Sequence, residues 1–171
     1  MKVLTVLVPT YNVEKYLRRC LDSLLLPEVL EEIEVLVVND GSKDGSADIA
    51  RAYEKKYPQT VVFVDKENGG HGSTINVGIE KAQGTYFKVL DSDDWVNIGD
   101  FIEFVKRLKE ETADAVICDY RKEHVYNGKS EYFEYKDLED GKKYNLNEID
   151  LNILHGEYFM MATTTYRTEV L

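Results

Sequence analysis

Short runs of apolar and largely β-branched residues alternate with amphipathic stretches over the first 118 residues of the chain. This alternation is typical of parallel strands joined by crossover helices. The runs show no regular polar alternation, which predicts strands that are covered on both faces of a sheet. We expect these strands at residues 3–8, 34–38, 61–64, 87–90 and 115–118.

The segments between these runs carry apolar residues at helical spacing. Asn12 and Ser46 belong to the residue types that cap helices, so we expect them to be the N-caps of the first two helices, the second of which extends through Tyr57. A third helix is expected to begin near Ser73, and a fourth spans the apolar positions between residues 101 and 108. Together these elements predict an α/β fold with an open, mostly parallel sheet and helices on both faces.

The pattern changes after residue 118, where tyrosines and charged residues become frequent. Residues 120–136 are typical of two strands around Asn127-Gly128, a favoured hairpin turn, and predict a small added β layer. We then expect a charged loop at 137–143, a short helix at 146–154 and a last strand at 159–166. Thr168 resembles an N-cap, followed only by the first turn of a helix. Because an isolated first turn is unstable, we expect residues 1–171 to be a single domain that is truncated at its C-terminus.

Composition limits the classes of partner. With 171 residues, of which 43% are hydrophobic, the chain can form one core. Its 32 acidic residues exceed its 21 basic ones, which disfavours binding to nucleic acid or directly to an anionic membrane surface. Cys20 and Cys118 have no partner Cys or His at metal-ligand spacing, so neither a zinc site nor a disulfide framework is indicated and a cytoplasmic setting is expected. No run reaches the roughly 18 apolar residues of a membrane span, so no transmembrane segment is expected.

Polar or glycine-rich clusters follow each of the first four predicted strands. In open α/β sheets, ligands bind outside the carboxyl ends of the strands. Any one of these clusters alone is more typical of an ordinary turn or helix cap than of a site. Four of them at one edge of a sheet predict a ligand-binding site. The clusters lie at residues 9–12, 39–42, 68–72 and 91–94.

Three carboxylates in the last cluster indicate a metal ion. Asp91, Asp93 and Asp94 follow a buried strand directly. Two like charges about 4 Å apart repel by roughly 1 kcal/mol in water and roughly 4 kcal/mol at an effective dielectric of 20. Oxygen ligands without nearby His or Cys favour Mn²⁺ or Mg²⁺, which commonly share substrate phosphates as ligands. The alternative is that Asp93 or Asp94 only begins the loop toward the fourth helix.

Two further groups are candidates for binding the rest of a ligand. The loop at 68–72 has three glycines before a helix, where backbone amides and the helix dipole can hold an anion. His71 in this loop can donate to a phosphate, although a solvated histidine is the alternative. Tyr11 and Asp40 follow the first two strands, and an aromatic face beside a carboxylate suits a nucleobase. Asp40 can equally serve as an ordinary turn residue.

Five motifs, taken in order, resemble glycosyltransferase family 2. They lie at residues 8–12, 37–46, 68–70, 76–78 and 90–94, and the resemblance is close over residues 3–110. It implies a GT-A fold that binds a nucleotide diphosphate sugar, with a UDP-sugar favoured, in residues 1–118, and an acceptor side that starts at residues 119–171. It also implies donor contacts from Pro9, Thr10, Tyr11, Asp40, Asn68, Gly70, His71, Asp91 and Ser92, and metal contacts from Asp93 and Asp91. Where the family commonly has Ala-Arg-Asn, this chain has Thr-Ile-Asn at 74–76. The arginine that would support the phosphates is missing, so we expect His71 and the loop amides to bind them instead.

The resemblance further implies an inverting transfer of the sugar to a hydroxyl group on a saccharide or glycolipid acceptor, at the inner face of a membrane. A general base must take the proton of that hydroxyl. In the family this base belongs to a Glu-Asp pair beyond the strand that residues 162–166 resemble. The pair Glu139-Asp140 comes earlier and is interpreted as solvated surface. The base is therefore expected beyond Leu171, and residues 1–171 are expected to bind the donor but to transfer sugar poorly.

Two other functions are compatible with the same residues. One is a sugar-phosphate nucleotidyltransferase, which also uses a carboxylate-bound metal, although the glycine-rich basic loop typical of that class is absent after Val8. The other is a non-catalytic module that retains nucleotide-sugar binding.

Overall fold

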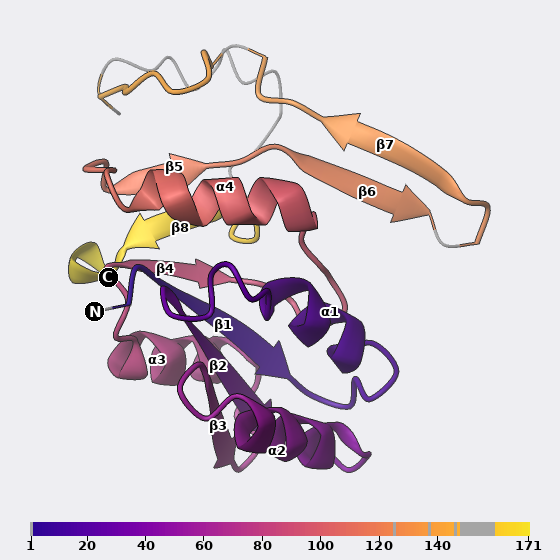
Figure 1. Ribbon diagram of the computed structural model, residues 1–171. Coiled ribbons are helices and arrows are strands. Elements are labelled where there is room, and N and C mark those ends of the chain that lie inside the picture. The colour runs from indigo at the N-terminus through magenta and orange to yellow at the C-terminus, as the bar shows by residue number, and fades with distance from the viewer. Residues whose placement is uncertain (1, 125, 137, 146, 148–159) are drawn as a thin grey trace.

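A mixed α/β fold forms around one mostly parallel sheet in the computed structural model, which describes residues 2–124, 126–136, 138–145, 147 and 160–171 (Figure 1). Within these residues the main sheet has six strands in the order β3-β2-β1-β4-β8-β5. Strands β1 to β4 are parallel to one another, and β8 is antiparallel to both of its neighbours. The strands are β1 (Leu4–Thr10), β2 (Ile33–Asp40), β3 (Val61–Lys66), β4 (Tyr86–Val89), β5 (Ala115–Ile117) and β8 (Thr164–Arg167).

Helices cover both faces of the sheet, as the sequence predicts. They are α1 (Leu17–Leu24), α2 (Ser46–Lys56), α3 (His71–Lys81) and α4 (Ile98–Leu108). Residues of α1, α2 and α4 form the larger core on one face, and α3 packs alone on the other face. Across the described residues, no helix combines the length and the apolarity needed to cross a membrane.

Successive residues of a strand point to opposite faces of the sheet, which explains why the apolar runs show no regular polar alternation. Every residue of β1 is buried, and Val6 and Val8 point into the larger core whereas Leu7 points toward α3. A strand between two helical layers must therefore be apolar on both sides. Full burial of each such side chain contributes about 1.5–3 kcal/mol, so the buried residues of β1 and β2 contribute strongly to core stability.

The added β layer is also confirmed. Strands β6 (Tyr120–His124) and β7 (Lys129–Phe133) form a separate antiparallel pair. Gly128 has a φ of 67° at the turn, a conformation that glycine adopts readily. The rings of Tyr120 and Phe133 stack across the two strands with centroids 4.7 Å apart. Figure 1 shows this hairpin extending beyond the edge of the main sheet.

The predicted N-caps are wrong. Helix α1 begins at Leu17 with Tyr16 as its N-cap, because Asn12 adopts a left-handed φ of 54° and its side chain accepts from the amide of Lys43 instead. Ser46 is the first residue of α2, and Gly45 occupies the cap position. Helix α3 begins at His71, two residues earlier than the expected Ser73.

The C-terminal part differs from the prediction as well. The last strand, β8, covers Thr164–Arg167 rather than 159–166. Thr168 is not an N-cap, because its hydroxyl donates to the carbonyl of Gly84 at 2.6 Å, and residues 168–170 form a 3₁₀ turn capped by Arg167. The helix predicted at 146–154 lies outside the described residues, except for position 147.

Strand β8 inserts between β4 and β5 and is held there by a buried lysine. The ammonium of Lys88 in β4 donates to the carbonyl of Ala162 at 2.6 Å. Burial lowers the pKa of Lys88. The segment that follows the added β layer in the chain therefore returns to the central sheet beside β4, next to the acidic cluster.

We predict that Gly84→Ala strongly destabilises the fold. A Cβ at Gly84 would lie 2.4 Å from the amide nitrogen of Thr5 and 2.7 Å from the carbonyl carbon of Leu4, and neither backbone atom can move freely. We expect a loss of about 3 kcal/mol in the free energy of unfolding, measured by urea denaturation. The control is Gly99→Ala in α4, where the new Cβ meets only the side-chain oxygen of Asn97 at 3.7 Å. Equal stabilities of the two variants would contradict the close approach at Gly84.

Candidate functional site

The four polar clusters lie at one edge of the sheet. Strands β1, β2 and β3 run in parallel register, so that Thr10 is level with Asn39 and Asp40 is level with Lys66. The acidic cluster follows β4, which is the other neighbour of β1. The carboxyl edge expected from the sequence is therefore one continuous surface.

A set of reciprocal hydrogen bonds, here called the β1–β2 clasp, joins the loops that follow β1 and β2. The side chain of Asn12 accepts from the amide of Lys43 at 2.8 Å, and the hydroxyl of Ser42 accepts from the amide of Asn12 at 3.1 Å. The carboxylate of Glu14 accepts from the amide of Gly45 at 2.7 Å. Two further bonds run from the amide of Glu14 to Asp44 and from the amide of Val13 to Ser46. Each loop thus satisfies the backbone donors of the other.

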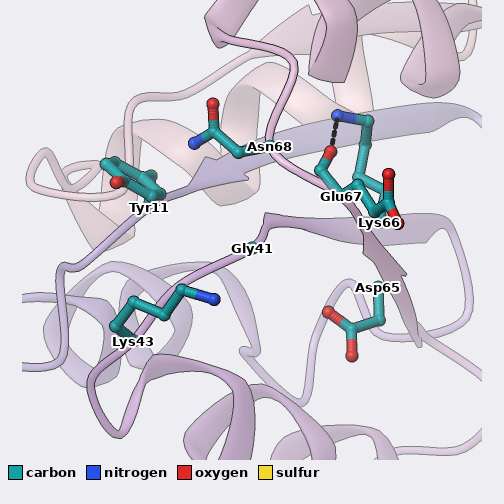
Figure 2. Close-up of a pocket in the computed structure, with 7 residues that line it drawn as sticks. All are labelled: Tyr11, Gly41, Lys43, Asp65, Lys66, Glu67 and Asn68. Atoms are coloured by element: carbon teal, nitrogen blue, oxygen red, sulfur yellow. Dashed lines mark hydrogen bonds between the residues drawn. The ribbon is translucent and has the colours of Figure 1, made fainter.

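A pocket of about 560 Å³ opens beside this clasp (Figure 2). It is lined by Tyr11, Gly41, Lys43, Asp65, Lys66, Glu67 and Asn68. Its volume lies within the range of about 300–1,000 Å³ of small-molecule sites. Figure 2 shows Tyr11, Lys43 and Asn68 on one side of the pocket and Asp65 on the other. Half of the Tyr11 side chain is exposed, so its ring face is available to a planar ligand.

Asp40 lies beneath this pocket and organises the glycine loop. Only 3% of Asp40 is exposed. Its carboxylate accepts from the amides of Gly69 at 2.9 Å and Gly70 at 2.8 Å, and from the ammonium of Lys66. Burial alone would raise the pKa of Asp40, but the hydrogen bonds from Lys66 and the two amides outweigh it and hold this pKa below its usual value. The carboxylate is therefore ionised and already has three donors.

Lys66 and Lys43 are pocket residues that the sequence analysis missed. The ammonium of Lys66 also donates to the carbonyl of Glu67 at 2.6 Å and to the hydroxyl of Ser73 at 2.8 Å. Lys66 has no local signal in the sequence, because its role follows from the register that places it beside Asp40. The pocket lining thus contains two lysines and, with Asp65 and Glu67, two acidic residues.

His71 connects the glycine loop to the acidic cluster. The Nε2 atom of His71, at the start of α3, lies 3.2 Å from Oδ1 of Asp91. Both side chains are about half exposed. The predicted anion-binding loop and the predicted metal-binding carboxylates are thus in direct contact.

The carboxylates of Asp91, Asp93 and Asp94 share one environment. Burial, then Asp93 and Asp91, raise the pKa of Asp94. Burial is also the main cause of the raised pKa of Cys20, and all three carboxylates add to it. Within the described part of the chain, no three His, Cys, Asp or Glu side chains enclose a preformed metal cage. An open set of one or two carboxylates nevertheless fits Mg²⁺ or Mn²⁺, which take further ligands from water and phosphate.

Helix α1 supports the loop that carries these carboxylates. The thiol of Cys20 donates weakly to the carbonyl of Asp91 at 3.9 Å, and the hydroxyl of Ser23 accepts from the amide of Val96 at 3.2 Å. The guanidinium of Arg19 lies over the ring of Trp95, 3.2 Å from its centroid. One face of α1 therefore fixes both ends of the acidic loop.

The predicted site residues fall into three groups. Tyr11 and Asn68 line the pocket. The buried residues are Pro9, Thr10, Asp40 and Ser92, and the hydroxyl of Thr10 donates to the carbonyl of Val8 at 3.1 Å. The group around the glycine loop and acidic cluster consists of Gly70, His71, Asp91 and Asp93.

We predict that Asp40→Asn lowers the free energy of unfolding by about 2 kcal/mol at pH 7, because it breaks a buried, hydrogen-bonded ion pair. The ionised carboxylate stabilises the fold above its usual pKa near 3.8, and this contribution is lost as the pH falls through the lowered pKa of the folded state. The difference between wild type and variant should therefore be constant above about pH 5 and shrink below pH 3.8 in urea titrations. The control is Asp140→Asn, which removes the exposed ion pair with Arg107. This variant should change the free energy of unfolding little, at neutral or at acidic pH. A difference that persists undiminished at pH 2 would contradict the role of the charge.

Comparison with known proteins supports this arrangement. The family model of Glycosyl transferase family 2 matches residues 5–165 of the chain. The putative glycosyltransferase EpsH of Bacillus subtilis (strain 168) is 41% identical over 126 residues, which are 74% of this chain and 36% of EpsH. The crystal structure of S. aureus TarS residues 1–349 superposes with a TM-score of 0.76 and 30% identity, over 100% of this chain and 48% of that one.

The same TarS fragment has also been crystallised with UDP-GlcNAc, and that structure matches with a TM-score of 0.69 and 28% identity, over 100% of this chain and 46% of that one. The chain thus spans about a third of EpsH and about half of the TarS fragment. These likenesses confirm the GT-A fold expected from the sequence. Because the family model covers nearly all of its length, the chain belongs to glycosyl transferase family 2.

Proposed function

We propose that this chain is the donor-binding part of an enzyme that transfers a sugar from a nucleotide diphosphate sugar to a hydroxyl acceptor on a saccharide or glycolipid. The observation that carries this proposal is the pocket beside Tyr11, together with the contact between His71 and Asp91 at its neighbouring loop. The complex of TarS with UDP-GlcNAc supports a UDP-sugar as the donor.

The chemistry of the pocket suits the two halves of such a donor. The exposed ring of Tyr11 can stack on a nucleobase, and the amide of Asn68 and the ammonium of Lys43 can bond to its polar edge. The charge of the diphosphate is then met at the start of α3, where the helix dipole favours an anion. The amides of Gly69 and Gly70 do not take part, because they already donate to Asp40. Residues 1–118 thus form the donor half in this proposal, and residues 119–171 begin the acceptor half.

Asp93, with help from Asp91, would hold Mn²⁺ or Mg²⁺. A divalent ion bound there neutralises charge that develops on the leaving diphosphate. The cluster suits this role because Asp94 has a raised pKa, caused by burial and by the charges of Asp93 and Asp91. Carboxylates that repel one another in this way gain from a shared cation.

The transfer we propose inverts the configuration at the anomeric carbon. The acceptor oxygen bonds to that carbon, the bond from the carbon to the diphosphate oxygen breaks, and the acceptor proton passes to a general base. Glu139 and Asp140 are poorly suited to be this base, because they are exposed and paired with Lys142 and Arg107. This described pair is therefore not our candidate for the base, and we propose that the base lies beyond Leu171, as the resemblance to the family implies.

We predict that UDP binds to this chain in a metal-dependent manner. Affinity measured by calorimetry should rise at least tenfold on addition of Mn²⁺, and Asp93→Ala should remove most of that gain. The matched control is Asp114→Ala, which removes an exposed carboxylate that pairs with Arg167 and should leave the affinity unchanged. Equal UDP affinity in Mn²⁺ and in EDTA, with no loss on Asp93→Ala, would contradict the metal site and favour a non-catalytic module. No binding of UDP at all would contradict the proposed donor site.

We also predict that residues 1–171 alone release UDP from a UDP-sugar much more slowly than a longer form that supplies the base, by about 10²–10⁴-fold. The measurement is a coupled UDP-release assay with and without saccharide acceptors. Release of pyrophosphate from UTP and a sugar phosphate would identify a nucleotidyltransferase instead. Fast and acceptor-specific transfer by residues 1–171 would disprove the proposed location of the base.

A further inference from the structure

We propose that His71 is a positioning residue that holds the carboxylate of Asp91 in the orientation needed for metal-assisted donor binding. This inference rests on the proposed function and adds a residue to it. The sequence suggests instead that His71 donates directly to a phosphate. The two roles place the same imidazole on different partners, so they can be separated by experiment.

The backbone on both sides of His71 is fixed. The amides of Gly69 and Gly70 donate to the buried carboxylate of Asp40, and Gly70 has a φ of 83°, a conformation rarely open to other residues. After His71, the hydroxyl of Thr74, itself 1% exposed, donates to the carbonyl of His71 at 2.6 Å. The hydroxyl of Ser73 donates to the carbonyl of Gly70 at 2.7 Å. The imidazole therefore projects from a rigid turn.

The imidazole makes its polar contact with Asp91. Nε2 lies 3.2 Å from Oδ1 of Asp91, within the range of an N–H···O hydrogen bond. The Nε2–H tautomer of neutral histidine can make this bond, as can the protonated form, so the contact does not require a charged ring. Oδ2 of Asp91 has no hydrogen-bond partner among the residues that the structure describes, so it can face a cation. A hydrogen bond to one oxygen of a metal-binding carboxylate commonly orients the side chain and leaves its other oxygen for the metal ion.

Asp91 needs such a partner because of its neighbours. Asp93 and Asp94 follow Asp91 in the same short loop and are also acidic. Repulsion favours rotamers that turn Asp91 away from the cluster. The carbonyl of Asp91 is held by Cys20, but this contact fixes only the backbone. His71 supplies the contact that fixes the carboxylate.

A double-mutant cycle tests the inference. The quantity measured is the factor by which Mn²⁺ raises UDP affinity, for wild type, His71→Ala, Asp91→Ala and the double variant. We expect His71→Ala to reduce this factor about tenfold. In the Asp91→Ala background the same substitution should have no further effect, because His71 acts only through Asp91. His71→Gln, whose amide can donate from a similar distance, should stay within about threefold of wild type.

His124→Ala is the matched control, because it removes another histidine–carboxylate pair, with Glu131 in the hairpin, far along the chain from the site. Unfolding temperatures of all variants separate a folding defect from a local one. Additive losses in the cycle would mean that His71 contacts the ligand directly and would overturn the inference, as would an unchanged factor in His71→Ala. If wild type itself shows no Mn²⁺-dependent binding of UDP, the proposed function fails first.

Discussion

A buried negative charge at the end of β2 is the constraint on which the site depends. The carboxylate of Asp40 is removed from water, and such a charge is tolerated in a fold only with several donors around it. Those donors come from β3, through Lys66, and from the turn before α3, through Gly69 and Gly70. One side chain thus joins the end of β2 to the end of β3 and to the turn before α3, which lie 26 to 30 residues further along the chain. The position of α3, and with it the contact to Asp91, follows from the need to satisfy this charge.

The sequence predicts the layers of this fold well because burial on two faces leaves a clear pattern. A run such as β1, which lacks regular polar alternation, is not typical of a half-exposed strand. The amphipathic segments between the runs then have only the two faces of the sheet to cover. Parallel strands then place the polar clusters at one edge without further information. The hairpin at Asn127-Gly128 is equally local, because its turn residues specify it.

What the sequence does not predict depends on partners far along the chain. Asn12 is a residue type that often caps helices, but here it accepts a hydrogen bond from the amide of Lys43 and adopts a left-handed conformation. Local propensity does not indicate that distant partner. The insertion of β8 between β4 and β5 is likewise a long-range event. Lys66 was missed for the same reason, since its importance lies in its register with Asp40. The sequence shows that three carboxylates lie close together after β4, but it does not predict their contact with His71.

The β1–β2 clasp has a consequence for how a ligand is received. Each loop uses its side chains to hold the main chain of the other, so Tyr11 and Lys43 are presented from a frame that is already ordered before any ligand arrives. A ligand that enters between them does not have to immobilise these loops, and more of its contact energy remains as affinity. Substitutions in the two loops are therefore coupled. Replacing an acceptor side chain in one loop leaves a backbone amide of the other loop without its hydrogen-bond acceptor.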